Sequence, residues 1–154
     1  MKKNILVLTL FLLTFTKIFA QNEEEKGVRA TINQLFEGMR KSDSSMVRGV
    51  FHPSCRMQSM YVSSKTGKPQ LETEDSINSF VKSIGTPHKE IYDERLLSWD
   101  IKIDGNLALV WTPYEFWLGD KLSHCGVDTY VLFKGETGWK ITHLADTRRK
   151  NCGK

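Results

Sequence analysis

The second half of the chain alternates β-rich runs with very short turns, and this spacing limits the possible folds more than any other feature. Loops of two to four residues join antiparallel neighbours, because parallel strands need a much longer crossover. The sequence therefore predicts an antiparallel meander of successive hairpins. Its expected strands are Leu96–Ile103, Leu107–Trp117, Leu122–Phe133 and Trp139–Asp146, joined by turns at Asp104–Asn106, Gly119-Asp120 and Gly135–Gly138.

The first half of the chain has mainly helical patterns. Apolar residues recur at helical spacing in residues 23–42, in a short segment that Asp43 or Ser44 can cap, and in residues 73–84 before Gly85. One strand is expected at Arg56–Val62, followed by a turn around Gly67. Helices followed by an antiparallel meander predict an α+β domain in which the helices pack on one face of a curved sheet.

Residues 1–20 have the pattern of a secretory signal peptide. Lys2 and Lys3 precede an apolar run from Ile5 to Phe15, and Ala20 provides a small residue before a polar and acidic stretch. The apolar run is shorter than the ~20 residues that a transmembrane helix needs. We therefore expect cleavage after Ala20, a secreted or periplasmic location, and no membrane association of the remaining chain.

The basic charge of the chain is largely a property of this leader. The sequence has 22 basic and 18 acidic residues, and three of the basic residues, Lys2, Lys3 and Lys17, lie in the leader, which leaves 19 basic residues against 18 acidic ones. A nearly neutral chain gives no support to nucleic-acid binding. Residues 21–154 are enough for one domain and too few for two.

The three predicted turns also fix a register, and the register decides which side chains share a face of the sheet. The main predicted pairs are Trp99 with Trp111, Glu115 with His124, Trp111 with Asp128, Tyr130 with His143, and Asp128 with Ala145. One face then collects Trp99, Trp111, Glu115, Trp117, His124, Asp128, Tyr130 and His143.

An aromatic face with a few embedded ionisable groups is typical of a small-molecule pocket. Burial beside other ionisable groups would also shift pKa values there. Two simpler alternatives stay open, since Asp128 and His143 could be a hydrogen-bonded pair in the core and His124 could face solvent. Pro113 in the middle of its strand indicates an edge or a bulge.

Three cysteines in an oxidising compartment suggest one disulfide and one free thiol. Every pairing of Cys55, Cys125 and Cys152 is possible from the count. The register places Cys125 opposite Arg148, near the segment that carries Cys152, so Cys125–Cys152 is the preferred pair. The chain has no CxxC and no paired Cys/His spacing, and we expect no metal site. Phosphate-loop and dinucleotide motifs are absent, and we expect no cofactor.

Three stretches of the chain stand out beside the order of its elements: INQLFEGMRKSD (32–43), VFHPSC (50–55) and GWKITHLADTRR (138–149). This order and text resemble the nuclear transport factor 2-like superfamily. The resemblance covers residues 21–154 as a single domain. It implies a cone in which a strongly curved, mostly antiparallel sheet wraps around three N-terminal helices, leaves a pocket at its open end, and forms homodimers through its convex face. Within the superfamily, the stretch SHCGVD (123–128) and the ending from Trp139 to Arg149 are most similar to a group of secreted bacterial proteins labelled lumazine-binding.

Enzymes of this superfamily suggest a type of chemistry. In them, a carboxylate in an apolar cone abstracts a proton next to a carbonyl, while a tyrosine or a protonated acid stabilises the oxyanion. By analogy, Asp128 or Glu115 is the candidate base and Tyr130 or His143 the candidate donor. His143 with Asp128 could also imitate the His–Asp dyad of dehydratase members. The candidate ligand contacts are Trp99, Trp111, Trp117, His124 and Tyr130.

Three functions compete at this point, because this fold hosts many activities. The favoured hypothesis is a secreted protein that binds a small hydrophobic or aromatic molecule in the cone. The first alternative is a cofactor-independent isomerase, cyclase or dehydratase that acts on a small cyclic or carbonyl compound. The second alternative is a dimeric interaction module whose cone is filled by its own side chains.

Overall fold

The computed structural model describes the backbone of residues 2–74 and 76–153, and the side chains from residue 21 onward within those ranges. The predicted leader lies outside the residues whose side chains are described, so it stays a prediction. Among the described residues, no helix is both long enough and apolar enough to cross a membrane. The elements of the described chain are α1 (Lys2–Lys41), α2 (Ser44–Val50), β1 (Phe51–Val62), β2 (Pro69–Glu74), α3 (Asn78–Gly85), β3 (Tyr92–Leu96), β4 (Asp100–Asp104), β5 (Leu107–Leu118), β6 (Lys121–Gly135) and β7 (Gly138–Arg148).

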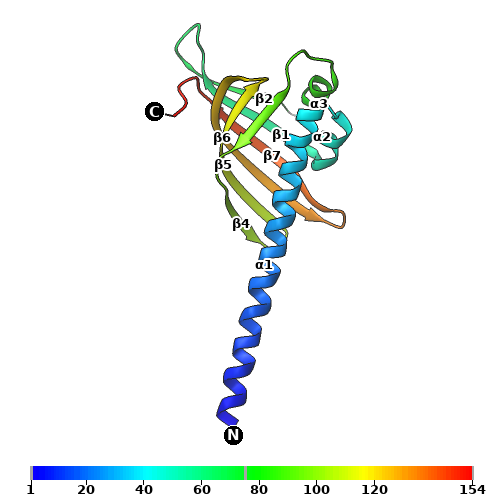
Figure 1. Cartoon of the computed structure of the whole chain (residues 1–154), viewed down its shortest axis with the longest axis vertical. Helices are drawn as coiled ribbons and strands as arrows, with labels where there is room; N and C mark the ends of the chain where they lie inside the picture. Colours follow the sequence, from blue (N-terminus) through cyan, green and yellow to red (C-terminus); the bar gives the residue numbers. More distant parts are fainter. Residues whose placement is uncertain (1, 75, 154) are drawn as a thin grey trace.

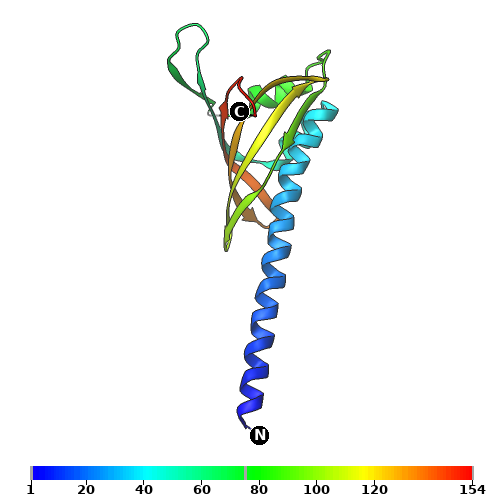
Figure 2. The ribbon, with the colours of Figure 1, turned by 60° about the vertical axis from the view of Figure 1, so that its left-hand side comes forward.

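The described strands form one curved sheet that does not close into a barrel. Its order is β2-β1-β7-β6-β5-β3, and β4 pairs with β5 along the same edge as β3. β1 and β7 run parallel, while the other neighbours are antiparallel. Figure 1 shows the second half of α1 lying across the sheet, with α2 and α3 at its upper end. In Figure 2 the β1–β2 hairpin projects beyond the sheet, on the side away from α1.

The apolar stripe of α1 packs into the concave side of the sheet. The predicted stripe is buried throughout, and its members are Val28, Ile32, Leu35, Phe36 and Met39. They join one core cluster with Leu132 and Ile141 of the central strands. Gly38 allows α1 to approach α2 closely, because a side chain there would begin 2.7 Å from Val47. The α+β class and the curved sheet around helices are confirmed.

The expected third helix begins later than the sequence pattern indicates. Thr73 and Glu74 belong to β2, where they pair with Gln58 and Met57 of β1. The turn at Gly67, with φ of 66°, returns the chain alongside β1. Strand pairing therefore takes the residues that the helical pattern assigned to the start of the helix, and α3 begins at Asn78. The order is also less segregated than expected, because a second strand, β2, follows the expected strand β1 before α3.

The run predicted as one strand, 96–103, is two strands. β3 ends at Leu96 and β4 begins at Asp100. The break lies beside Pro113 of β5, which has no backbone N–H to give to a neighbour. The chain is held there by other bonds, from the Leu97 amide to the Pro113 carbonyl (2.9 Å) and from the Thr112 hydroxyl to the Ser98 carbonyl (2.6 Å).

The two later hairpins begin with the predicted partners, and then a bulge shifts each register by one residue. Trp117 pairs with Leu122 as expected, but one extra residue, Ser123, makes His124 oppose Phe116. The last hairpin likewise starts correctly, and its extra residue, Thr142, changes the partners beyond it. Beyond a bulge of one residue, each side chain opposes a partner one position away from the predicted one, and the predicted partner points to the other face of the sheet.

The predicted composition of the pocket face is therefore wrong in part. Asp128 opposes Thr112 and Asp146, and not Trp111 and Ala145. The first hairpin also differs, because its turn has two residues and Asp104 pairs with Leu107. The concave face carries Thr112, Tyr114, Phe116, His124, Asp128, Tyr130, Leu144 and Asp146, whereas Trp111, Glu115, Trp117 and His143 belong to the other side.

Candidate functional site

A cavity of about 460 Å³ lies between the concave face of the sheet and helices α1 and α3. One part of its wall is apolar or aromatic and comes from both helices and the sheet. The other part is polar and comes mainly from strands. The apolar and aromatic lining residues are Leu35, Phe36, Met39, Met57, Phe80, Ile84, Tyr92, Tyr114, Phe116, Tyr130 and Leu144, and the polar ones are Ser59, Glu72, Glu74, Ser79, Ser83, Glu94, His124, Asp128, Asp146 and Arg148.

Two carboxyl groups meet at the polar part of this wall. Asp128 of β6 is 3% exposed, and its carboxyl lies within hydrogen-bonding reach of the Glu94 carboxyl from β3. The buried Tyr130 hydroxyl donates a second hydrogen bond to Oδ2 of Asp128, at 2.8 Å. Glu94 keeps some exposed surface because it lines the cavity, although protein surrounds it on its other sides.

Burial makes this pair hold a proton at neutral pH. The pKa of Glu94 is raised well above its ordinary value, first by desolvation and then by the neighbouring Asp128 charge. Desolvation also raises the pKa of Asp128 to about 7, although its hydrogen bonds to Glu94 and Tyr130 act in the opposite direction. Two carboxyls in contact cannot both ionise easily, so the pair shares one proton.

A second polar group links β1, β5 and β7 beside this pair. Arg148 donates from Nε to Asp146 Oδ2 at 2.7 Å, and the Ser59 hydroxyl donates to Asp146 Oδ1 at 2.5 Å. The Tyr114 hydroxyl lies 3.3 Å from Asp146 Oδ2 and 3.1 Å from the Thr147 carbonyl oxygen. Burial and the carboxylates around it raise the pKa of Tyr114 far above its ordinary value, so Tyr114 serves as a neutral donor.

His124 is a neutral imidazole at the cavity wall. Burial is the main cause that lowers its pKa, and the positive charge of Arg148 adds to the effect. Its Nδ1 lies 3.1 Å from the Ser123 hydroxyl, and its ring packs on Phe116 with centroids 4.9 Å apart. The tilted stack with Phe116 and the edge contact with Tyr114 hold the ring at the cavity.

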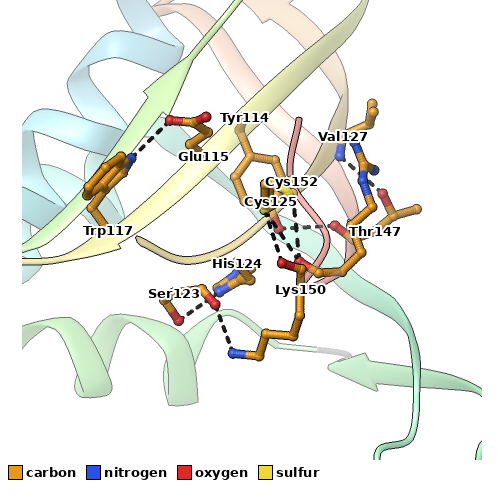
Figure 3. Close-up of a disulfide and its surroundings, with 11 residues drawn as sticks. Tyr114, Glu115, Trp117, Ser123, His124, Cys125, Val127, Thr147, Lys150 and Cys152 are labelled. Atoms are coloured by element: carbon orange, nitrogen blue, oxygen red, sulfur yellow. Dashed lines mark hydrogen bonds between the residues drawn. A yellow bond between two sulfur atoms is a disulfide. The ribbon is translucent and has the colours of Figure 1, made fainter. Parts of the chain in front are cut away.

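A disulfide fixes the end of the sheet that carries His124 (Figure 3). Cys125 and Cys152 are bonded with Cα atoms 5.8 Å apart, which is the pair favoured from the sequence. Backbone bonds of 2.9 and 3.0 Å between Cys125 and Arg149 hold the same segment. The remaining thiol, Cys55, is buried, and desolvation raises its pKa to about 12, so it is not a ready nucleophile.

Three of the predicted site residues, His124, Asp128 and Tyr130, line the cavity. The others lie outside its lining. Trp111 is 54% exposed on the opposite side of the sheet, and His143 bonds Gln58 through Nε2 at 3.1 Å. The structure therefore does not bring His143 to Asp128 as a dyad.

The predicted tryptophan walls are also placed elsewhere. Trp117 donates from Nε1 to the Glu115 carboxylate at 3.1 Å, and the Arg95 guanidinium lies over the Trp117 ring. Trp99 packs against the core under Arg29, whose guanidinium carbon is 4.7 Å from the ring centroid. The aromatic part of the wall instead comes mainly from phenylalanines and tyrosines.

Sequence reasoning missed Glu94, Tyr114 and Asp146. Glu94 lies in β3, a strand that was not predicted because "YDERL" has only a weak apolar alternation. Tyr114 and Asp146 are absent from the predicted pocket face because the two bulges were not recognised. Among the described residues, no three His, Cys, Asp or Glu side chains are arranged to hold a metal ion.

Solved structures with this arrangement share little sequence with the chain. An NTF2-like protein with a cystatin-like fold from Novosphingobium aromaticivorans matches with a TM-score of 0.72 at 8% identity, over 90% of both chains. A nuclear transport factor 2-like superfamily protein from Salmonella enterica matches with a TM-score of 0.67 at 17% identity, over 86% of this chain and 96% of the other. The chain has the nuclear transport factor 2-like fold.

Another structure with this fold carries a functional description. It is an NTF2-like family protein from Streptomyces avermitilis, provisionally described as a dehydratase, with a TM-score of 0.67 and 14% identity over 85% of this chain and 99% of the other. No family model and no curated protein matches the sequence. The fold is therefore established by shape, while the lumazine-binding group stays a prediction.

Proposed function

We propose that this protein binds a small organic molecule in the cavity, with an apolar or aromatic body against the helices and a polar end at Glu94 and Asp128. The observation that supports it best is the combination of volume and lining. Small-molecule pockets of ~300–1,000 Å³ have mostly apolar walls and a few placed polar groups, and a cavity of about 460 Å³ with this lining fits that description. A cone filled by its own side chains, as the interaction-module alternative requires, fits it poorly.

A fragment screen with a blocked-cavity variant tests this proposal. Ser83 is exposed on α3 and lines the cavity, so Ser83→Trp places an indole in the opening, whereas the neighbouring Lys82 does not line it. Fragments, with pteridines and flavins among them, are screened by ligand-observed NMR against wild type, Ser83→Trp and the control Lys82→Trp. We expect hits that Ser83→Trp abolishes and Lys82→Trp retains. Hits that bind all three proteins equally would contradict the proposal.

Acid–base catalysis on a carbonyl compound is the second candidate. The shared proton of Glu94 and Asp128 favours it, because a carboxyl whose pKa is about 7 can both accept and donate a proton at neutral pH. The test is deuterium exchange at the carbon next to the carbonyl in a panel of small cyclic ketones. Catalysed exchange that Asp128→Asn abolishes supports an enzyme, and exchange at the buffer rate with every ketone argues against one.

Secretion is proposed on the leader pattern of residues 1–20, and the Cys125–Cys152 disulfide suits an oxidising compartment. N-terminal sequencing of the protein recovered from a bacterial periplasm or culture medium tests it. A chain that begins at Gln21 supports cleavage after Ala20, and a chain retained in the cytoplasm with Met1 intact would contradict it.

Homodimerisation through the convex face is proposed from the family resemblance. Apolar side chains on that face support it, since Leu109, Trp111 and Phe133 are 45%, 54% and 45% exposed. Sedimentation velocity of wild type and Trp111→Lys tests the idea. We expect a dimer that the substitution dissociates, and a wild-type protein that stays monomeric at 100 μM or so would contradict it.

A further inference from the structure

The ionisable residues that line the cavity are unbalanced in charge. Among the described lining residues, five carry carboxyl groups and one, Arg148, carries a permanent positive charge. The imidazole of His124 adds no positive charge at neutral pH, because burial lowers its pKa. The five carboxyl residues are Glu72, Glu74, Glu94, Asp128 and Asp146.

Arg148 is already engaged with one of these carboxylates. Its Nε and Nη2 both contact Asp146, and Nη2 also donates to the Ser59 hydroxyl at 2.8 Å. None of the other four lining carboxyls forms an ion pair with a described Lys, Arg or His side chain. The cavity therefore holds carboxyl groups in excess of the cations that its own wall supplies.

The protein balances part of this excess with a proton. The proton shared by Glu94 and Asp128 satisfies both carboxyls in the absence of a cation. An ammonium group could take the place of that proton, because it donates up to three hydrogen bonds and brings a full positive charge. Aromatic faces next to a carboxylate further favour a cation, and Tyr92, Phe116 and Tyr130 line the same cavity.

We propose that the ligand of this cavity is an organic cation, a small amine with an apolar or aromatic body whose ammonium group contacts Glu94 and Asp128. This inference rests on the proposed binding function and adds the chemical class of the ligand. Two further carboxyl residues of the lining, Glu72 and Glu74 on β2, act in the same direction by attracting a cation to the cavity.

Three probes of similar size and different charge test it: 2-phenylethylamine, 2-phenylethanol and phenylacetate. Affinities are measured by titration calorimetry with the purified protein at pH 6.5, in two buffers with different ionisation enthalpies. We expect the amine to bind at least tenfold more tightly than the alcohol and the carboxylate to bind least. The two buffers should also show that amine binding releases a proton, since the ammonium group displaces the one on the carboxyl pair.

Two variants locate the effect. Glu94→Gln is nearly isosteric and keeps a hydrogen-bond donor toward Asp128, so it should weaken amine binding about tenfold and abolish the proton release, while weakening alcohol binding far less. Asp100→Asn removes an exposed carboxylate outside the cavity and should change neither. Unchanged amine binding in Glu94→Gln would overturn the proposed contact.

The outcomes separate this inference from the function on which it rests. If the alcohol or the carboxylate binds as tightly as the amine and Ser83→Trp blocks that binding, the charge preference is wrong and the binding function stands. If the amine binds without proton release, the exchange of proton for cation is wrong. If neither these probes nor the fragment collection binds, both proposals fall.

Discussion

At the scale of single residues, the carboxyl pair links the site to the stability of the fold. The pKa of both carboxyls is raised in the folded protein, chiefly by desolvation. A group whose folded pKa exceeds its unfolded value favours the folded state below the unfolded pKa, and this contribution is lost as pH rises through the folded pKa. Because of Glu94 and Asp128, the free energy of unfolding should therefore decrease as pH rises from about 4 to about 8.

Replacing one member of the pair tests this linkage. Glu94→Gln removes a titrating carboxyl but keeps a donor to Asp128, so the variant should gain stability relative to wild type as pH rises. Because one pKa unit corresponds to about 1.4 kcal/mol, the difference in unfolding free energy should change by about 1 kcal/mol or more between pH 5 and pH 8. Urea unfolding at several pH values measures it, and a difference that stays constant with pH would refute the shared proton.

The buried hydroxyl of Tyr130 has a separate and smaller role. Tyr130→Phe removes the 2.8 Å hydrogen bond to Asp128, which leaves that carboxyl less satisfied and should raise its pKa further. We expect a loss of about 1–2 kcal/mol in unfolding free energy at pH 7. Tyr61→Phe, on the projecting part of β1, is the matched control, and an equal loss in both variants would contradict the role assigned to Tyr130.

The sequence predicts these residues unevenly. Asp128 and Tyr130 could be assigned to one face because both follow the bulge at Ser123, and strand alternation in β6 is uninterrupted between them. Glu94 could not be found, since its strand is short and its partner in the site lies more than thirty positions away in the chain. The contact depends on the pairing of β3 with β5, which local pattern does not encode.

At the scale of elements, turns were predictable and bulges were not. Gly105 and Gly119 have the positive φ of tight turns, and short turns of this kind leave a clear sequence signature. The extra residues Ser123 and Thr142 are polar and follow a turn closely, so nothing in the apolar pattern marks them. The missed bulges account for much of the error in the predicted pocket face.

A close approach between two strands gives an element-scale prediction. A Cβ on Gly126 would lie 1.7 Å from the Thr147 carbonyl oxygen and 2.8 Å from the Tyr114 ring. Gly126→Ala should therefore push β7 away from β6 and reduce the unfolding free energy by about 3 kcal/mol. Gly135→Ala in the same strand meets only the ring of Phe133, which is 45% exposed, and should cost under about 1 kcal/mol. Similar urea midpoints for the two variants would contradict this account.

The disulfide gives a second prediction at this scale. Closing a loop across a sequence separation of 27 residues corresponds to about 3.5 kcal/mol from the entropy of the unfolded chain. Reduction should lower the thermal midpoint and release the chain that follows Arg148. Differential scanning calorimetry with and without reductant measures the change, and the Cys125→Ser/Cys152→Ser double variant should no longer respond. A reductant response retained by the double variant would show that the effect comes from elsewhere.

At the scale of the whole molecule, a curved open sheet and helices on its concave side leave a cavity that the core does not fill. The resemblance to the nuclear transport factor 2-like superfamily predicted this architecture, and the solved structures confirm it. It did not predict which side chains line the cavity. The lining depends on the strand registers, and the same fold can form with different registers. Shape is therefore established here, and the chemistry of the cavity comes from the residues alone.

The state of the carboxyl pair in the cavity is the claim on which the account depends most. A pH titration of the Asp and Glu side-chain carboxyls by ¹³C NMR, with assignment through Glu94→Gln and Asp128→Asn, measures it directly. We expect both resonances to titrate together and above the ordinary carboxyl range, with Asp128 near pH 7, and 2-phenylethylamine to move both. If both carboxyls titrate below about pH 5 as exposed ones do, the pair does not share a proton and the account is contradicted.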